Sequence, residues 1–362
     1  MAFHGAMTEG LSMFALRRIA FAATVAALIV GGVPLSANAQ TSSPSCSDVH
    51  IPVALADGAA KTYTMYGRLC HPSTGPSRTI QILVHGITYD HNYWDLPGFG
   101  EMYDYSGAQN AAGYTTLAVD RIGSAGQSSI PPSALLNLDS DAVSIHDVVQ
   151  AARAGSIPGG PYEKVLMVGH SYGSAIAWQE DTAYNDVDGI ISSGLGHLLG
   201  NLQGLGTSLE PALLDPRLAP RVGLDAGYLT TLPGTRGSLF YNAPDTDPAV
   251  VAYDESTKGL VSATELGTIP QFEVASLGVT GPMFMVMGQD DGFFCLQGGK
   301  LGLDDCATDQ TLYNSEAPFF PGADMQTYVL PNAGHDINGE LNASDWYAQA
   351  AAWATSHVPP QG

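Results

Sequence analysis

Short apolar runs alternate with amphipathic stretches over much of the chain. The runs at 78–86, 114–123, 163–171 and 186–194 have the length and apolar content of buried strands. Between the second and third runs, residues 139–154 bring their apolar side chains near one helical face. Strands that alternate with helices pair in parallel through right-handed crossovers. The pattern therefore predicts an α/β fold with a mostly parallel, doubly wound sheet.

The stretch before the first of these runs differs in pattern. Residues 61–71 alternate between apolar and polar positions with a period of two, which is typical of an antiparallel hairpin at the edge of a sheet. Residues 40–48 are rich in Ser, Thr and Pro, and this composition predicts a mobile tail.

The strand and helix rhythm stops at 195–279, which is rich in Gly, Pro, Leu and Asp and has few strand-like runs. It returns at 281–291 and 325–336, and a final helix is expected near the end of the chain. We therefore expect a core made of 40–194 and 280–362. The stretch between them is expected to be an insertion that covers the carboxyl ends of the strands as a cap or lid.

The N-terminus has the pattern of an export signal. An Arg-Arg pair at 17–18 precedes an apolar run at 19–33, and Ala-Asn-Ala at 37–39 offers small residues before a cleavage point. The pattern predicts that residues 1–39 are a signal peptide removed after Ala39, and that the protein is secreted to the periplasm or beyond the cell. The run is too short to predict stable membrane anchoring.

The chain is strongly acidic, and this charge bears on which classes of partner it can bind. It has 35 Asp and Glu against 13 Lys and Arg, a formal net charge of −22. Such a surface repels phosphate backbones, so the charge argues against nucleic acid as a partner. It does not specify an oligomeric state.

The cysteine count agrees with export to an oxidising compartment. The four are Cys46, Cys70, Cys295 and Cys306, an even number in a chain expected to be exported, which favours two disulfides over free thiols. Of the three pairings, the local one that joins 46 to 70 and 295 to 306 is the simplest. No Cys or His spacing is typical of a metal site, so neither metal nor cofactor is expected.

A candidate nucleophile lies at the end of the third run. Residues 169–173 read Gly-His-Ser-Tyr-Gly, with a strand before them and a helix-like stretch after them. A serine in this context occupies a tight strand-to-helix turn that needs small neighbours. Ser171 is then exposed at the turn, and the backbone N–H of Tyr172 is directed toward the position where an oxyanion would form.

A serine hydroxyl needs a base and an acid before it reacts. Among ten histidines, His335 directly follows an apolar run, which indicates a loop at the carboxyl end of a strand. The acid is expected after the preceding strand, where the sequence offers Asp290 and Asp291. We favour Asp291 for its spacing from the glycine that ends the strand, and keep Asp290 as the alternative.

Taken in order, these motifs resemble the α/β-hydrolase family over nearly all of the chain beyond 39. His85-Gly86 after the first parallel strand is similar to the family's oxyanion motif, and residues 119–128 are similar to its Asp-x-x-Gly-x-Gly-x-Ser loop with one extra residue. The resemblance implies an eight-stranded sheet and no cofactor. It implies Ser171 as nucleophile, Asp291 as acid and His335 as base, with the backbone N–H of Ile87 as second oxyanion donor.

The loop after the oxyanion motif is rich in aromatic residues. His85, Tyr89 and Trp94 are candidates for lining an acyl or aryl pocket, because this loop borders the active-site mouth in the fold that the resemblance implies. Packing of the loop against the first helix is the alternative interpretation.

The expected function is that of a secreted, esterase- or lipase-like serine hydrolase. It would cleave a small-molecule carboxylic ester or lactone through an acyl-enzyme. An aminopeptidase or amidase is one alternative, with Glu210, Glu255, Glu265 or Glu273 holding a substrate amine. An acyltransferase or lyase of the same fold is another, and a catalytically inactive binding protein on this scaffold is the third.

Overall fold

The computed structural model describes residues 44–299 and 302–361, together with Met1 and Ala2. The predicted signal peptide therefore lies outside the described residues, apart from its first two. Among the described residues, no helix is both long and apolar enough to cross a membrane.

The described residues form an eight-stranded sheet in the order β1-β2-β4-β3-β5-β6-β10-β11. From β4 onward, neighbouring strands are parallel, whereas β2 pairs antiparallel with both β1 and β4. The predicted α/β fold with a mostly parallel sheet is confirmed. The strands are β1 (Ser45–Val53), β2 (Tyr63–His71), β3 (Thr79–Val84), β4 (Thr115–Val119), β5 (Lys164–His170), β6 (Gly189–Ser193), β10 (Thr280–Gly288) and β11 (Gly322–Leu330).

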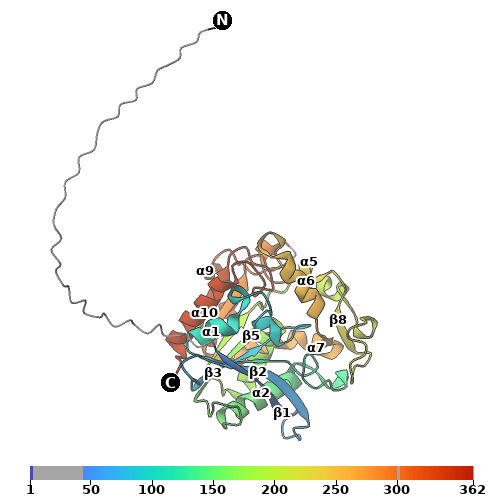
Figure 1. The fold of residues 1–362 in the computed structure, drawn as a ribbon, viewed down its shortest axis with the longest axis vertical. Helices are drawn as coiled ribbons and strands as arrows, with labels where there is room; N and C mark the ends of the chain where they lie inside the picture. Colours follow the sequence, from blue (N-terminus) through green and yellow to red (C-terminus); the bar gives the residue numbers. More distant parts are fainter. Residues whose placement is uncertain (3–43, 300–301, 362) are drawn as a thin grey trace, which may run out of the picture. The chain divides into compact units, whose positions relative to one another are not determined.

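Helices cover both faces of this sheet. On one face α1 packs against α10, and on the other α2 packs against α3 (Figure 1). The polar side chain of Gln81, buried in β3, donates to Gln109 of α1 at 3.0 Å, and Gln109 donates to the backbone of Tyr347 in α10 at 3.1 Å. These bonds satisfy amides that would otherwise be costly to bury. The helices are α1 (Tyr105–Ala111), α2 (Leu138–Arg153), α3 (Tyr172–Tyr184), α9 (Asp309–Glu316) and α10 (Ala343–His357).

Strand β1 differs from the expectation of a mobile tail at 40–48. Residues from Ser45 onward pair with β2, and Cys46 lies opposite Cys70 in the register. These two cysteines form a disulfide, and Cys295 pairs with Cys306, as in the local pairing. The polar, Pro-rich composition of this stretch does not predict a strand. Hydrogen bonds to β2 and the disulfide to Cys70 hold it in place as one.

The segment between β6 and β10 has its own small antiparallel sheet, β7-β8-β9. Backbone hydrogen bonds join it to the loops that follow the core strands: Thr88 exchanges them with Gly259 and Leu260, and Ser124 accepts one from Leu260. These bonds hold the segment against the carboxyl ends of β3 and β4. Its elements are α4 (Leu202–Thr207), β7 (Leu209–Pro211), β8 (Tyr228–Thr231), α5 (Arg236–Phe240), α6 (Pro248–Thr257), β9 (Val261–Ser262), α7 (Ala263–Thr268) and α8 (Phe272–Ala275).

A buried histidine supports the start of this segment. The His197 ring lies between the rings of Trp178 and Phe319, with interplanar angles of 2° and 3°. Its Nδ1 lies 2.6 Å from Glu316 Oε2, and its Nε2 lies 2.8 Å from Ser276 Oγ. Burial lowers the pKa of His197 to about 4, so the ring is neutral at pH 7, donates to Glu316 and accepts from Ser276.

A second acid, Asp304, lies beside Glu316. Neither carboxylate oxygen of the fully buried Asp304 has a hydrogen-bond partner among the described residues. A Cβ at Gly196 would come within 2.4 Å of Asp304 and 3.2 Å of Glu316, so both acids crowd the same glycine. Burial, and then the charge of Glu316, raise the pKa of Asp304 to about 9, and burial raises the pKa of Glu316 to about 7.

Asp304→Asn tests whether the raised pKa of Asp304 destabilises the folded protein at high pH. The unfolded chain loses the Asp304 proton near its ordinary pKa of 3.8, whereas the folded chain keeps it to about 9. Unfolding therefore releases a proton across this window, and the stability of the wild type falls as pH rises through it. The Asp304→Asn variant lacks this dependence. We expect its Tm at pH 8 to exceed the wild-type Tm by about 3 °C or more, and by less at pH 5.

Thermal unfolding at a series of pH values measures this difference. Asp324→Asn, at an exposed position, makes the same chemical change and should follow the wild-type curve. An Asp304→Asn variant whose Tm follows the wild type at every pH would contradict the expectation.

Candidate active site

Ser171 lies in a tight turn between β5 and α3, with φ of 51° and ψ of −122°. This is a positive φ that side chains other than glycine rarely adopt. The turn is held by close backbone approaches. A Cβ at Gly173 would come within 2.1 Å of the Val84 carbonyl oxygen, and one at Gly169 within 2.5 Å of Ser174. Glycine at both positions therefore lets α3 begin directly beside the end of β3.

The structure brings Ser171, His335 and Asp291 together. Ser171 Oγ lies 3.0 Å from His335 Nε2, and His335 Nδ1 lies 2.9 Å from Asp291 Oδ2. The other carboxylate oxygen of Asp291 accepts the backbone N–H of Phe293 at 2.8 Å. His335 and Asp291 are buried, whereas Ser171 is partly exposed. This arrangement can take a proton from the serine and hold the resulting imidazolium beside a carboxylate.

The sheet explains how distant residues meet. Ser171 follows β5, Asp291 follows β10 and His335 follows β11, three parallel strands of one sheet, so their carboxyl ends share one edge. Asp290 turns elsewhere, and its Oδ2 accepts from Asn242 at 3.2 Å. Of the two acids left open by the sequence, the structure brings Asp291 to His335.

Two residues whose amides are candidate oxyanion donors line a cavity beside Ser171. Tyr172 is the first residue of α3, so its N–H has no acceptor within the helix. Ile87, Tyr172, Ser171 and His335 all line one cavity. The oxyanion role of the Ile87 and Tyr172 amides stays a prediction.

The peptide unit that carries the Ile87 amide is held from behind. Its carbonyl, that of Gly86, accepts from His85 Nδ1 at 2.8 Å and from Arg121 Nη2 at 3.4 Å. The Ile87 N–H points away from these donors because the two groups are trans in one peptide plane. His85 Nε2 accepts the backbone N–H of Arg121 at 3.1 Å, which assigns the Nδ1–H tautomer. Burial and then the charge of Arg121 lower the pKa of His85 to about 3.

Arg121 links this peptide to the inserted segment, a role that the sequence interpretation missed. Its guanidinium donates to Glu265 of α7 at 2.5 Å and lies 5.1 Å from the ring centroid of Tyr172. All three side chains are buried. Glu265, one of the candidate amine-binding glutamates, is therefore paired with an arginine and does not line the cavity. An arginine in the loop after β4 was the available signal.

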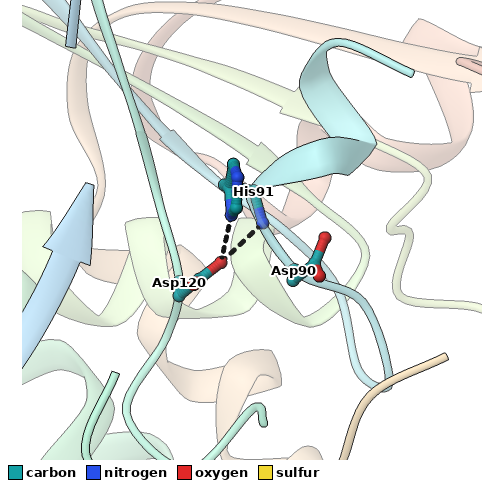
Figure 2. Close-up of side chains that lie close together, drawn as sticks. All are labelled: Asp90, His91 and Asp120. Atoms are coloured by element: carbon teal, nitrogen blue, oxygen red, sulfur yellow. Dashed lines mark hydrogen bonds and ion pairs between the residues drawn. The ribbon is translucent and has the colours of Figure 1, made fainter. Parts of the chain in front are cut away.

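A cluster of Asp90, His91 and Asp120 joins the segment after β3 to the loop after β4 (Figure 2). Asp120 Oδ1 accepts from the backbone N–H of His91 at 2.8 Å and from its Nδ1 at 2.7 Å, and Oδ2 accepts from Gln127 at 2.6 Å. The three side chains could approach a metal ion, since their ligand atoms lie within 4.8 Å of one another. Hydrogen bonds already occupy both Asp120 oxygens, however, and account for the geometry.

The cavity beside Ser171 is small, with a volume of about 50 Å³. Most of its wall is apolar. The inserted segment and the loop before it supply Leu195, Leu199, Leu205, Phe240, Ile269 and Phe272, the loop after Asp291 supplies Phe293 and Phe294, and α3 supplies Ala175. None of these residues was predicted from the sequence, and those within 195–279 lie where the apolar positions follow no helical or strand period.

The three pocket candidates lie elsewhere. His85, Tyr89 and Trp94 are buried and are absent from the lining of this cavity. His85 holds the Gly86 peptide, and Trp94 packs against Tyr105 of α1 with ring centroids 5.2 Å apart. The Tyr89 hydroxyl donates to Asp336 at 2.8 Å. The alternative interpretation, packing of the loop against the first helix, describes the position of Trp94.

Comparisons with known proteins give the same fold. The chain matches the family model described as "Alpha/beta hydrolase family" over residues 81–350. No curated protein matches the chain.

Solved structures are similar in fold at low identity. A thermophilic esterase from Thermogutta terrifontis has a TM-score of 0.56 and 14% identity, over 86% of this chain and all of its own. A putative aryl esterase from Burkholderia cenocepacia has a TM-score of 0.59 and 11% identity, over 86% of this chain and 99% of its own. DcsB in complex with its substrate analogue has a TM-score of 0.59 and 14% identity, over 87% of this chain and all of its own.

The sheet order and a family match that covers most of the chain lead to one conclusion. This chain belongs to the alpha/beta hydrolase family.

Proposed function

We propose that this protein is a serine hydrolase that cleaves carboxylic esters, lactones included, with an uncharged, apolar acyl or aryl group. The observation that carries the proposal is the unbroken hydrogen-bonded series from Ser171 Oγ through both nitrogens of His335 to Asp291. A serine is activated only when such a base is within reach and is itself oriented by an acid.

In the proposed reaction, Ser171 Oγ attacks the ester carbonyl while His335 Nε2 takes the hydroxyl proton. The amides of Ile87 and Tyr172 stabilise the oxyanion. His335 then donates the proton to the departing alcohol oxygen, which leaves an acyl group on Ser171. Water, activated by the same histidine, attacks the acyl-enzyme and releases the acid. Asp291 stabilises the imidazolium in both halves.

The cavity wall supports the choice of substrate class. Apart from Ser171, Tyr172 and His335, the lining residues are aliphatic or aromatic, so burying a charged acyl group there would be costly. The glutamates considered for an amine do not line the cavity, and Glu255 accepts the amides of Gly234 and Arg236 instead. This favours an ester hydrolase over an aminopeptidase.

We also propose that the protein acts outside the cytoplasm. Its two disulfides are of the kind that form and persist in oxidising compartments, and the N-terminal pattern is typical of a signal peptide.

Ser171→Ala tests the nucleophile. We expect kcat for p-nitrophenyl butyrate to fall by about 10⁶-fold, because the remaining amides and cavity can bind the ester but form no acyl-enzyme. The matched control is Ser156→Ala at an exposed position, which should retain wild-type kcat. A fluorophosphonate should label the wild type at Ser171. Full activity in the alanine variant would rule out the mechanism.

A pair of adjacent variants tests the acid. Asp291→Asn should lower kcat by about 10⁴-fold, because the amide no longer favours the productive His335 tautomer. Asp290→Asn makes the same change one residue earlier, where the side chain contacts Asn242, and should stay within about threefold of wild type. Steady-state kinetics of both variants give the comparison. The reverse ranking would assign the acid to Asp290.

The cavity wall predicts a dependence on acyl length. Leu205→Trp in α4 should fill part of the cavity and lower kcat/KM for p-nitrophenyl octanoate by about tenfold or more, with little change for the acetate. Leu214→Trp, the same change at an exposed position, should leave the ratio of the two esters unchanged. An equal loss on both esters would mean that Leu205 does not face the acyl group.

A further inference from the structure

A second cluster of metal-binding side chains lies between α2 and α3, apart from the residues used above. It consists of His146 in α2, Glu180 in α3, and Asp186 in the loop that leads to β6. Glu180 is nine residues beyond Ser171 along α3, about 13 Å at the rise of a helix. One ligand atom from each residue lies within 4.8 Å of the other two.

The distances within this cluster, where His146 is hydrogen-bonded to Glu180, are longer than those of the other histidine–carboxylate pairs in the same protein. His146 Nδ1 lies 3.2 Å from Glu180 Oε1 and 3.2 Å from Asp186 Oδ2. The other His–carboxylate contacts, at His91, His197 and His335, measure 2.7, 2.6 and 2.9 Å. His146 thus stands at equal and longer distances from two carboxylates, whereas each of the others makes one short bond.

Each acid of the cluster also has an oxygen without a partner. Glu180 is fully buried, and its Oε2 makes no hydrogen bond among the described residues. Asp186 Oδ1 is likewise buried and unpartnered there. A buried carboxylate oxygen without a donor is costly unless a cation satisfies it. The Nδ1 of His146 faces Glu180 Oε1 and Asp186 Oδ2, and Gln150 donates to Asp186 Oδ2, so neither supplies the second oxygen of either acid.

We propose that His146, Glu180 and Asp186 form a binding site for a divalent transition-metal ion, with Zn²⁺ as the expected occupant. Zn²⁺ binds imidazole nitrogen and carboxylate oxygen at about 2.0–2.2 Å, which separates tetrahedral ligands by about 3.3 Å. The 3.2 Å spacings at His146 match this separation. Two carboxylates also balance the charge of the ion. A nitrogen ligand favours Zn²⁺ over Ca²⁺ and Mg²⁺, which prefer oxygen throughout.

Neighbouring groups hold the ligands in this arrangement. Gln150 Nε2 donates to Asp186 Oδ2 at 2.5 Å, and the Tyr184 ring stacks on His146 with centroids 3.6 Å apart. Arg153 donates to the backbone carbonyl of Asp186 at 2.6 and 3.1 Å. The side chains of His146 and Asp186 are 21% and 20% exposed, so an ion and a completing water can enter from solvent. The ion would join α2, α3 and the loop before β6.

The cluster in Figure 2 shows the contrast. There the His91 ring and the Asp120 carboxylate meet at 2.7 Å, and each Asp120 oxygen already has a donor. At that cluster neither Asp120 oxygen is free for a metal ion, whereas at His146 one oxygen of each acid, Glu180 Oε2 and Asp186 Oδ1, has no donor among the described residues.

The test is a titration of the untagged protein, stripped with EDTA and dialysed, with ZnCl₂ in a calorimeter. We expect one equivalent to bind, and a rise in Tm that EDTA reverses. Glu180→Gln and His146→Gln should each weaken binding by about tenfold or more and abolish the Tm shift. Glu163→Gln makes the same change at an exposed acid and should bind as wild type. Co²⁺ in place of Zn²⁺ should give the visible absorption of a tetrahedral site.

Three results would overturn the proposal. One is the absence of stoichiometric Zn²⁺ binding to the wild type. Another is wild-type affinity in the His146→Gln variant, whose partly exposed side chain keeps this arm usable if Glu180→Gln does not fold. The third is a His91→Gln variant that loses the ion while His146→Gln keeps it, which would place the metal at the Figure 2 cluster.

Discussion

The close approach of α3 to the end of β3 is the constraint on which the rest of the site depends. At Gly173 there is no room for a Cβ beside the Val84 carbonyl, and this contact allows the chain to leave β5 and enter a helix within one residue. Ser171 is left at a positive φ with its hydroxyl toward His335 and the first free amides of α3 beside it. The strain of one residue is thus maintained by the packing of a whole helix.

The segment between β6 and β10 contributes to the site together with the sheet. It supplies most of the apolar wall of the cavity, and α7 holds Arg121 through Glu265, so the Gly86 peptide is braced from the same segment that covers it. Glu340 adds a similar tie on the histidine side. One of its oxygens accepts the amides of Gly334 and Asn242, at 2.8 and 2.9 Å, which joins the loop of His335 to the insertion. Movement of the insertion would therefore disturb both halves of the proposed mechanism.

Buried acids recur around this architecture and are handled in different ways. Glu265 is neutralised by an arginine, and Glu340 accepts backbone amides. Among the described residues Asp304 has no such donor, and burial raises its pKa. Glu180 and Asp186 share one histidine, each at 3.2 Å, and each keeps an oxygen without a donor among the described residues, which is the reason for assigning them an ion. In each case the low dielectric of the interior makes a charged carboxylate unfavourable, and the available partner decides whether that desolvation is compensated.

The sequence by itself determined the parts that local pattern controls. Alternating strand and helix periods predicted the parallel sheet, and Gly-His-Ser-Tyr-Gly between a strand and a helix predicted the turn at Ser171. Both are properties of neighbouring residues. The spacing favoured Asp291 but left Asp290 open, and the tertiary structure brought Asp291 to His335. Tertiary structure alone decided that Ser45–Val53 is a strand, which residues line the cavity, and that Arg121 supports the Gly86 peptide. These depend on contacts between residues tens to hundreds of positions apart, and no local periodicity records which side chains such contacts bring together.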